Sequence, residues 1–505
     1  MDRRRRWPLI VGRTALGMVS LLVLGLTGYV WTFYHDFSTG LSTSGALSGD
    51  EPKSKDGATN ILVMGLDSRL DQNGQPLPQD IYDQLHAGDN SQGGYNTNVM
   101  MVLHVPNDGS KATLISIPRD DYATLVGAPD GIAKEKIKQG YGLAKDAKEK
   151  ALVSQGVTDR SRLEHEGREA GRKQTVDDVR AFLGGIPIDH FVEVTLIGFY
   201  DLAKALGSVT VCLQGPTQDS FSGANFVKGE QQLDAAQALA FVRQRRDYVH
   251  PELNFTDLDR ERRQQAFLAS ASQQLKSAGT LADPAKMSAL VGAATKDLVF
   301  DSGFDLMGFI QQSAGLVSGG VTYVTLPVKS FGKVNGEDVN LVDLNQIRTM
   351  VHDLIGDKTA PPPSTTLPAA KVDVVNSGGQ SGLAAQLLTA LAGKGATKGS
   401  PITGPSILSH STVYYGPGGA DAANAVGNLL GIDDVEAGST VAAGAVRVVI
   451  GTDFTMPAAQ ATPTSTTAVP PTSSTAPPTT TSSSGATGAS GPMDALQGGS
   501  VPCVK

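Results

Sequence analysis

The sequence predicts an α/β protein: a three-layer α/β/α domain on a mixed central sheet, one preceding transmembrane helix and a small C-terminal α/β domain. Three observations favour this fold class. Apolar runs typical of strands buried on both faces alternate with helical patterns. An uncharged stretch near the N-terminus is long enough to cross a membrane. A Pro-rich stretch separates a second strand-and-helix region from the first.

Length and composition set the outer bounds. The 505 residues leave room for two or three domains, and the net charge is −8. The arginine clusters are therefore not part of a general basic bias, which argues against nonspecific nucleic-acid binding. The chain has two cysteines, Cys212 and Cys503, so a zinc site or thiol redox motif is not expected. In an exported chain they form one disulfide to the extreme C-terminus; the alternative is two unpaired thiols.

Residues 14–34 are 21 positions without a charge, which predicts a transmembrane helix. Trp31 and Tyr34 suit the membrane interface, and the arginines of residues 1–13 place that segment in the cytoplasm. A cleaved signal peptide is the alternative, but the apolar run is long and no clear small-x-small cleavage site comes right after Trp31. We expect a single-pass protein of the cell membrane with a flexible tether at 35–58 and an extracytoplasmic remainder.

The main domain is expected over residues 59–355, and its first strands end in polar groups. The strands are the apolar runs 60–66, 99–105 and 112–117. Asp67 follows the first, Asn98 precedes the second, and Arg119, Asp120 and Asp121 follow the third. Ligands of open α/β sheets bind at the carboxyl ends of strands, so these residues are site candidates.

The rest of this domain alternates helices and strands. Residues 130–174 are charged and mostly helical in pattern, and Thr175 with Asp178 is interpreted as a helix start. The later elements are expected as a strand at 189–194, a helix at 196–206, a strand at 208–213, helices from 260 to about 315 and a strand at 321–326.

A linker at 356–369, which contains the sequence APPPSTTLP, leads to a second α/β domain at 370–453. Its expected elements are strands at 371–376, 412–415 and 445–451 with helices at 382–392 and 420–430. Residues 454–505 are mostly Pro, Thr, Ser, Ala and Gly, a composition that cannot bury a core, and we expect a disordered tail.

Six arginines crowd the segment 233–265. They are Arg243, Arg245, Arg246, Arg260, Arg262 and Arg263. Asp234 and Gln237 open a short amphipathic helix as a capping box. Arg243 and Arg245 would share one side of an extended segment, and Arg260, Arg263 and Gln264 one face of the next helix. Guanidinium groups match phosphate oxygens in pairs, so the pattern predicts a polyanion pocket; the alternative is solvated charge paired with nearby acids.

The strand-end oxygens suit a hard cation. Asp67 and Asn98, with Asp120 or Asp121 as a further ligand or base, fit Mg²⁺ or Mn²⁺, which bind through one or two carboxylates plus substrate phosphate. The alternative for each aspartate is a turn or helix cap. A cation beside clustered arginines is the equipment of phosphoryl transfer. His104 lies in an apolar strand and is expected to be a core histidine.

Several separated motifs carry a family resemblance over about residues 60–275. They are NILVMGLDSR (60–69), NVMMVLHV (98–105), SIPRDDY (116–122), KIKQGYGLA (136–144), IDHFVEV (188–194), LDAAQALAFVRQR (233–245) and DLDRERRQQAF (257–267). In these motifs the chain resembles the LytR-CpsA-Psr cell-wall glycopolymer ligases in their actinobacterial, mycobacterium-like form. The region 370–452 resembles the C-terminal domain often appended to such members.

The resemblance implies an activity: transfer of a glycan phosphate from a polyprenyl-pyrophosphate carrier to peptidoglycan, with Mg²⁺ or Mn²⁺. It implies arabinogalactan or a related wall polymer as the glycan. Asp67 would hold the metal, and Lys136 is a further candidate for a phosphate contact. The pyrophosphate would be bound by Arg119, Arg243, Arg245, Arg260 and Gln264. Helices 195–206 and 264–275 are candidate walls of a groove for the prenyl tail.

One departure from the family pattern matters for the metal. Asn96, Thr97 and Asn98 stand where many members carry Arg-Ser-Asp, so an amide replaces a metal carboxylate and one pocket arginine is missing. Lower metal affinity is expected. Two other functions remain open: a pyrophosphatase acting on the same lipid, and a non-catalytic scaffold that binds wall polymer through 370–452.

Overall fold

The computed structural model divides into two compact units, residues 1–341 with 491–505, and residues 342–490. Its description covers residues 40–47, 51–55, 57–71, 74–87, 94–108, 110–277, 283–305, 308–309, 320–355, 367, 369–430, 432, 435–452, 454, 496–497 and 501–505. The predicted span 14–34 lies outside these residues. Within the described part, no helix combines the length and the apolar character that crossing a membrane requires.

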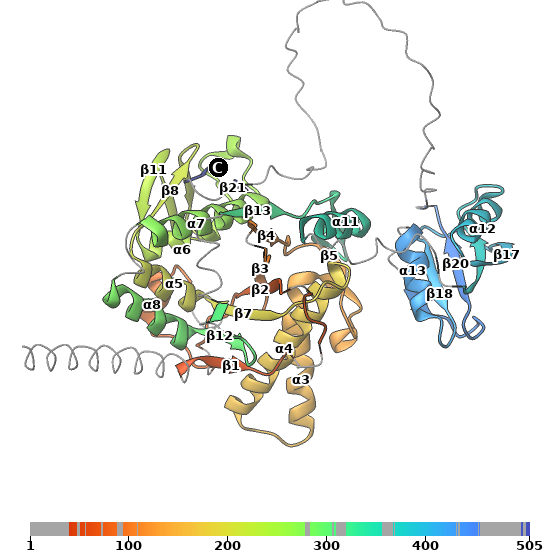
Figure 1. Ribbon diagram of the computed structural model, residues 1–505, viewed down its shortest axis with the longest axis horizontal. Helices are drawn as coiled ribbons and strands as arrows, with labels where there is room; N and C mark the ends of the chain where they lie inside the picture. Colours follow the sequence, from red (N-terminus) through yellow and green to blue (C-terminus); the bar gives the residue numbers. More distant parts are fainter. Residues whose placement is uncertain are drawn as a thin grey trace, which may run out of the picture. The chain divides into compact units, whose positions relative to one another are not determined.

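The first unit is built on an eight-stranded mixed sheet, which confirms the predicted α/β class (Figure 1). Its order is β1-β12-β7-β2-β3-β4-β13-β21. The strands are β1 (Ser42–Ser44), β12 (Leu298–Asp301), β7 (His190–Thr195), β2 (Thr59–Leu66), β3 (Thr97–Val105), β4 (Ala112–Ser116), β13 (Val321–Thr325) and β21 (Leu496–Gln497). The predicted strands of this sheet lie within one or two residues of those observed.

Strand direction decides where polar side chains meet. β2 pairs antiparallel with β3, and β3 pairs antiparallel with β4. The end of β2, the beginning of β3 and the end of β4 therefore lie at one edge of the sheet. Asp67, Asn98 and Arg119 are brought to that edge.

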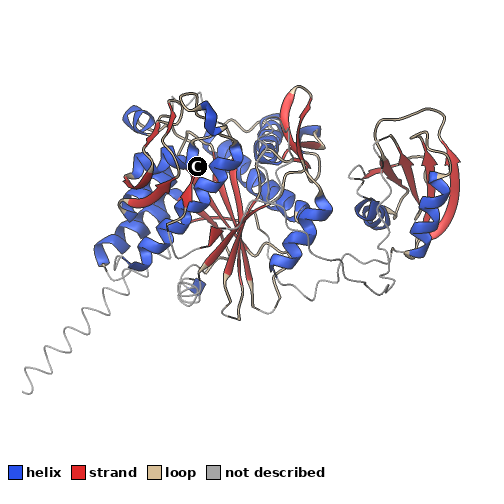
Figure 2. Ribbon diagram, turned by 90° about the horizontal axis from the view of Figure 1, so that it is seen from above, coloured by secondary structure: helices blue, strands red, loops and turns tan. Residues whose placement is uncertain are grey.

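Helices cover the sheet on both sides, so the unit has three layers (Figure 2). One side carries α3 (Gly140–Ser154) and α4 (Arg160–Phe182); the other carries α5 (Leu196–Leu206), α6 (Ala235–Arg243), α7 (Asp257–Ser277) and α8 (Pro284–Asp297). Phe241 and Phe267 lie in the core on the α5–α7 side. Smaller elements are α2 (Gln79–Gln84), β5 (Tyr122–Thr124), β6 (Lys134–Lys136), β8 (Val209–Leu213), β9 (Thr217–Asp219), β10 (Ala224–Phe226), β11 (Gly229–Leu233), β14 (Ser330–Val334) and β15 (Glu337–Leu341).

Two helix starts were predicted from side-chain caps, with opposite outcomes. Asp234 and Gln237 form the expected capping box at α6. Thr175 with Asp178 was wrong as a start, because both lie inside α4, whose N-cap is Asp159. The Thr175 hydroxyl donates to the Gly171 carbonyl at 3.1 Å, a local bond that a mid-helix threonine makes without ending the helix.

Among the strands that the sequence analysis does not predict, β1 and β12 have pairing partners that are distant in sequence. β1 lies within the predicted tether 35–58 and pairs parallel with β12. β12 interrupts the helices predicted from 260 to about 315 and pairs antiparallel with β7. Runs of three and four residues are too short for periodicity to reveal, so only long-range pairing defines them as strands.

The C-terminal end of the chain belongs to the first unit. Among the residues of the predicted 454–505 tail that the structure describes, β21 pairs with β13, and β22 (Cys503–Val504) pairs with β8. The disulfide Cys212–Cys503 joins β8 to β22, with 4.3 Å between the Cα atoms. The prediction of a wholly disordered tail was therefore wrong for these residues, since backbone pairing and a covalent bond hold them (Figure 1).

The second unit contains a five-stranded sheet of order β17-β16-β20-β18-β19 and α11 (Leu344–Ile355). Its other elements are β16 (Lys371–Asn376), α12 (Leu383–Gly393), β17 (Thr397–Thr403), β18 (Thr412–Tyr415), α13 (Ala420–Leu430), β19 (Val435–Ala437) and β20 (Val446–Ile450). Val374, Val413 and Val448 share one core with Leu387 and Val426 from the two helices α12 and α13. The part from β16 to β20 corresponds to the small α/β region that the sequence predicts at 370–453, whereas α11 precedes the predicted linker.

The disulfide yields a stability prediction. The bond closes a sequence separation of 291 residues, so its loss should lower the free energy of unfolding by roughly 2–5 kcal/mol. Chemical denaturation of the full chain should show this drop for the double variant Cys212→Ser/Cys503→Ser. Wild-type protein in reductant is the control and should unfold with the variant. An unchanged midpoint in both would contradict the prediction.

Candidate functional site

A large cavity of ≈ 830 Å³ extends from the polar edge of the sheet into the space between the sheet and helices α5, α6 and α7. Its inner walls are apolar. They include Val63 and Met101 from the sheet, Phe199 and Leu206 from α5, and Phe267 and Leu275 from α7. The two helices expected to wall a lipid groove thus both line this chamber, and α6 and α8 contribute Leu239 and Leu290.

The other end of the cavity is polar and cationic. Seven predicted site residues line it: Asp67, Asn98, Arg119, Arg243, Arg245, Arg260 and Gln264. Arg69 and Arg246 line it as well, although sequence reasoning did not select them. Arg69 follows Asp67 by two positions at the end of β2, a signal that could have identified it. Arg246 belongs to the arginine cluster of the sequence but has no assigned role there; its guanidinium lies 4.3 Å from the centre of the Phe221 ring at the cavity wall.

Arg119 is fixed by three hydrogen bonds at the sheet edge. Its Nη1 donates to Asn98 Oδ1 at 2.6 Å. Its Nε and Nη2 donate to the two carboxylate oxygens of Asp257 at 3.1 and 3.0 Å. The residue is 5% exposed, so this fork is held in place before any ligand arrives.

Asp257 joins two arginines. Besides the fork with Arg119, it accepts a bond from Arg260 Nη2 at 2.8 Å. Desolvation raises the pKa of Asp257, but the charges of Arg260, Arg119 and Arg245 outweigh it and hold that pKa below its ordinary value. Asp257 is therefore a carboxylate that keeps like charges together. Asp257 is one of the acids near the arginine cluster in the sequence, and its place one turn before Arg260 on α7 could have indicated the contact.

Arg243 and Arg245 reach the cavity, but not from one extended segment. Arg243 is the last residue of α6, and its Nη1 donates to the Leu85 carbonyl at 2.6 Å. Arg245 is exposed and lines the cavity, where no described residue forms a hydrogen bond with its guanidinium. Although the residue is exposed, partial desolvation of its guanidinium at the cavity lowers the pKa of Arg245, and the charges of Arg119 and Arg246 lower it further. Arg245 is thus a cation at the cavity that repels the neighbouring cations.

Gln264 and Arg263 are neighbours on α7, but only Gln264 lines the cavity. Gln264 lines the cavity, with its Nε2 donating to the Val242 carbonyl at 3.1 Å. Arg263 is fully buried, donates to Gln244, Thr217 and the Lys505 carbonyl, and lies over aromatic rings. Burial lowers the pKa of Arg263 to about 9. It holds the C-terminal residue against the core and is not placed at the cavity.

Asp120 and Lys136 lie outside the cavity lining, as does Asp121, which accepts a hydrogen bond from Asn340. Asp120 pairs with Lys138 at 2.5 Å and with Arg119 at 3.5 Å, so its carboxylate is held by two cationic side chains of the protein. Lys136 pairs with Glu337 of β15 at 2.5 Å. Both side chains are engaged by protein charges. His104 is a core histidine as expected: it is 4% exposed, bonds to Asn60 at 2.8 Å, and burial lowers its pKa.

The residues at the polar end offer limited ligands for a metal. Among the described residues, no group of three or more His, Cys, Asp or Glu side chains has the arrangement of a metal site. Of the predicted pair of metal ligands, Asn98 is an amide whose Oδ1 already accepts a hydrogen bond from Arg119. Asp67 is therefore the member of the pair that offers a carboxylate. Asp219 also lines the cavity, but its carboxylate accepts bonds from the Ser222 hydroxyl and the Phe221 amide. One carboxylate with substrate phosphate oxygens and waters still fits the ligand set that Mg²⁺ accepts in proteins.

Glu261 is a buried acid on α7, and its raised pKa predicts how the stability of the protein depends on pH. It is 4% exposed, neither of its carboxylate oxygens has a hydrogen-bond partner among the described residues, and burial and the charge of Asp257 raise its pKa to about 8. The folded state thus binds a proton that the unfolded state releases near pH 4.5. Stability linked to Glu261 should fall as pH rises from about 5 to 8, by up to about 1.4 kcal/mol per pH unit.

Denaturant unfolding of the full chain across this pH range checks the prediction. Glu261→Gln should remove this part of the slope and be more stable than wild type at pH 8. Glu230→Gln, at an exposed position, is the matched control and should follow wild type. Parallel curves for Glu261→Gln and wild type would show that Glu261 is charged throughout.

An apolar chamber that opens into a cluster of guanidinium groups has the chemistry that suits an amphiphile with a multiply anionic head group. The comparisons with known proteins identify the family. The chain belongs to the LytR_cpsA_psr family, whose model matches residues 31–355, and is a cell-wall glycopolymer transferase of that family. A second model, described as LytR cell envelope-related transcriptional attenuator, matches residues 369–454.

The chain is similar to several individual relatives and to a solved structure. The chain is 40% identical to the cell wall biosynthesis protein LcpA of Corynebacterium glutamicum, over 70% of this chain and 67% of that protein. It is 26% identical to the polyisoprenyl-teichoic acid–peptidoglycan teichoic acid transferase TagU of Bacillus subtilis, over 52% of this chain and 70% of that protein. A solved LytR-Csp2A-Psr enzyme from Actinomyces oris is 18% identical, covering 62% of this chain and 94% of that one, with a TM-score of 0.41.

Proposed function

We propose that this protein transfers a glycan phosphate from a polyprenyl-pyrophosphate carrier to peptidoglycan, with arabinogalactan or a related wall polymer as the glycan. One observation carries the proposal: the cationic end and the apolar chamber are parts of a single cavity. A prenyl chain needs an apolar wall, and a pyrophosphate needs several cations at one end of that wall. The cavity has both, side by side.

The cations divide into fixed and available groups. Arg119 and Arg260 are held by Asp257, and Arg260 Nε is buried without a hydrogen-bond partner among the described residues. Arg245 lines the cavity and is exposed. Arginines whose positions are already set lose little side-chain entropy when a phosphate binds, so they favour both binding and charge stabilisation during transfer.

In the proposed reaction a muramic-acid hydroxyl of peptidoglycan attacks the phosphorus that carries the sugar. The new bond joins the hydroxyl oxygen to phosphorus, the bridging P–O bond breaks, the hydroxyl proton is released to solvent, and polyprenyl phosphate leaves. Negative charge grows on the departing phosphate. Arg119, Arg245 and Arg260 bind and neutralise that charge, which is where most catalysis of phosphoryl transfer arises.

Asp67 would hold Mg²⁺ or Mn²⁺ at the polar end, with Asn98 as a neutral neighbour. When bound, such a cation supplies further neutralisation of the phosphate oxygens. Because Asn98 Oδ1 already accepts a bond from Arg119, Asp67 is the carboxylate that remains of the predicted pair. We therefore propose a metal that depends on the substrate phosphates for much of its coordination.

The proposed setting is the outer face of the cell membrane. The uncharged stretch 14–34 would anchor the chain and keep the cavity near a lipid carrier. Peptidoglycan, the proposed acceptor, lies on that side.

A transfer assay tests the proposal. The full chain in lipid vesicles, given lipid-linked glycan and peptidoglycan, should yield a covalent glycan–peptidoglycan adduct. Arg119→Ala should reduce kcat/KM by about 100-fold, because it removes a fixed fork from the departing charge. Arg262→Ala, on the same helix as Arg260 but away from the cavity lining, is the matched control and should stay near wild type.

Two outcomes would contradict the transferase. Free glycan phosphate without an adduct would indicate a pyrophosphatase that uses water in place of the hydroxyl. Full activity in cells of the Arg119→Ala variant would indicate a scaffold.

A further inference from the structure

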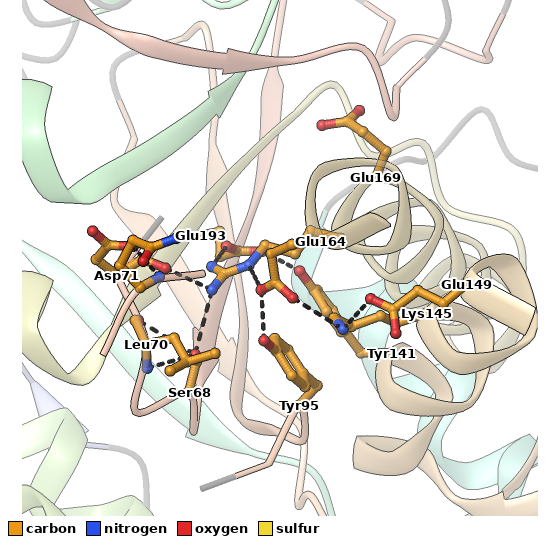
Figure 3. A network of polar contacts seen from close by, with 12 residues as sticks. Ser68, Leu70, Asp71, Tyr95, Tyr141, Lys145, Glu149, Glu164, Glu169 and Glu193 are labelled. Atoms are coloured by element: carbon orange, nitrogen blue, oxygen red, sulfur yellow. Dashed lines mark hydrogen bonds and ion pairs between the residues drawn. The ribbon is translucent and has the colours of Figure 1, made fainter. Parts of the chain in front are cut away.

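A buried ionic network joins α4 to the segments that contain Asp71 and Tyr95 (Figure 3). Its centre is Arg168 of α4, which is 1% exposed. The Nε of Arg168 donates to Glu164 at 2.6 Å, and its Nη1 lies 3.7 Å from Glu193 of β7. None of these residues lines the cavity, so the network is not explained by the proposed chemistry.

Arg168 contacts the segment that follows Asp67. Its Nη2 donates to the Asp71 carbonyl at 2.8 Å and to the Ser68 hydroxyl at 3.4 Å. Asp71 and Ser68 lie within four residues of Asp67. A buried guanidinium with two bonds to one short loop restricts the direction in which that loop leaves β2.

The same ion pair also reaches the segment that precedes Asn98. Glu164 accepts a bond from the Tyr95 hydroxyl at 2.5 Å through the oxygen that Arg168 contacts. The two segments are joined directly as well, since the Asp67 amide donates to the Asn96 carbonyl at 3.0 Å and the Gly94 amide to the Asp67 carbonyl at 3.1 Å. Arg168 and Glu164 thus hold both strand ends that present oxygens to the cavity.

The network is anchored on its far side. Glu193 is 0% exposed, accepts two bonds from Arg172 at 3.0 Å and one from the Tyr141 hydroxyl at 2.9 Å. Lys145 pairs with Glu164 at 3.1 Å and lies 4.0 Å from the centre of the Tyr95 ring. A charged group buried this deeply needs every partner in place, so the network has one arrangement and little freedom.

We propose that Arg168 is a positioning residue. It fixes the loop 67–71 and the segment 94–98, so that Asp67 and Asn98 keep their places at the polar end of the cavity. This inference rests on the proposed function and assigns a role to a residue that touches neither substrate nor metal. Outer partners of a ligand side chain change metal affinity or activity by about 10–100-fold when removed.

Arg172 offers a matched control. It lies one turn further along α4, is 3% exposed, and shares Glu193 with Arg168. Its hydrogen bonds go to Glu193 and Glu169, and within the described part of the chain none of them reaches either of the two segments. A purely structural ionic network would make the two arginines equivalent.

The test compares Arg168→Lys with Arg172→Lys in the full chain. Lysine keeps the charge but cannot donate to Glu164 and Asp71 with one planar fork. We expect Arg168→Lys to weaken Mn²⁺ binding, measured with pyrophosphate present, by about 10–100-fold. Amide hydrogen exchange should lose protection at 68–71 and 95–98. Arg172→Lys should lower the melting temperature to a similar extent with Mn²⁺ affinity within about twofold of wild type.

Three outcomes separate the possibilities. Equal losses of Mn²⁺ affinity and of loop protection in both variants would overturn the positioning role, as would unchanged values for Arg168→Lys. If wild type binds no Mn²⁺, the proposed metal fails, and hydrogen exchange still decides whether Arg168 holds the two segments. Loss of loop protection in Arg168→Lys alone would then support the role without the metal.

Discussion

The interaction on which the site depends is the bridge from Asp257 to Arg119 and Arg260 at the polar end of the cavity. Several guanidinium groups gather there, and without a carboxylate their mutual repulsion would drive them apart. Two unit charges 4 Å apart interact by about 4 kcal/mol at an effective dielectric constant of 20. Asp257 offsets this repulsion in the folded protein and sets the direction of both arginine side chains. The cationic end is therefore formed before a ligand binds.

The placement of these residues follows from strand direction. Because β3 runs opposite to β2 and β4, three polar groups from distant parts of the sequence meet at one edge. α7 then brings Arg260 and Gln264 to the same edge while Phe267 and Leu275 continue inward. One helix thus joins the anion-binding part to the apolar chamber, which is the physical basis for a ligand with a charged head and a long apolar tail.

Much of this could be predicted from the sequence, because the main strands are strong apolar runs and because Arg260 and Gln264 have the spacing of one helix face. Other features depend on contacts that no local pattern records. β12 is defined as a strand by its pairing with β7 and β1. Thr175 has the sequence pattern of a helix cap, but its hydroxyl donates to the Gly171 carbonyl inside the same helix. Lys136 looked like a phosphate ligand, but Glu337, 201 residues away, engages it. The contact of Asp257 with Arg119 and the contacts of Arg168 with the 68–71 segment depend on partners that only the fold reveals.

The central claim is that the arginines and the apolar chamber form one binding site, and ligand binding to the full chain tests it most directly. Farnesyl pyrophosphate, farnesol and inorganic pyrophosphate should be titrated against wild type and Arg260→Ala at two salt concentrations. We predict that farnesyl pyrophosphate binds at least about tenfold more tightly than either part alone, since each end contributes. Its affinity should fall with salt and in the variant. Equal binding of farnesol and farnesyl pyrophosphate, unaffected by Arg260→Ala, would contradict the account.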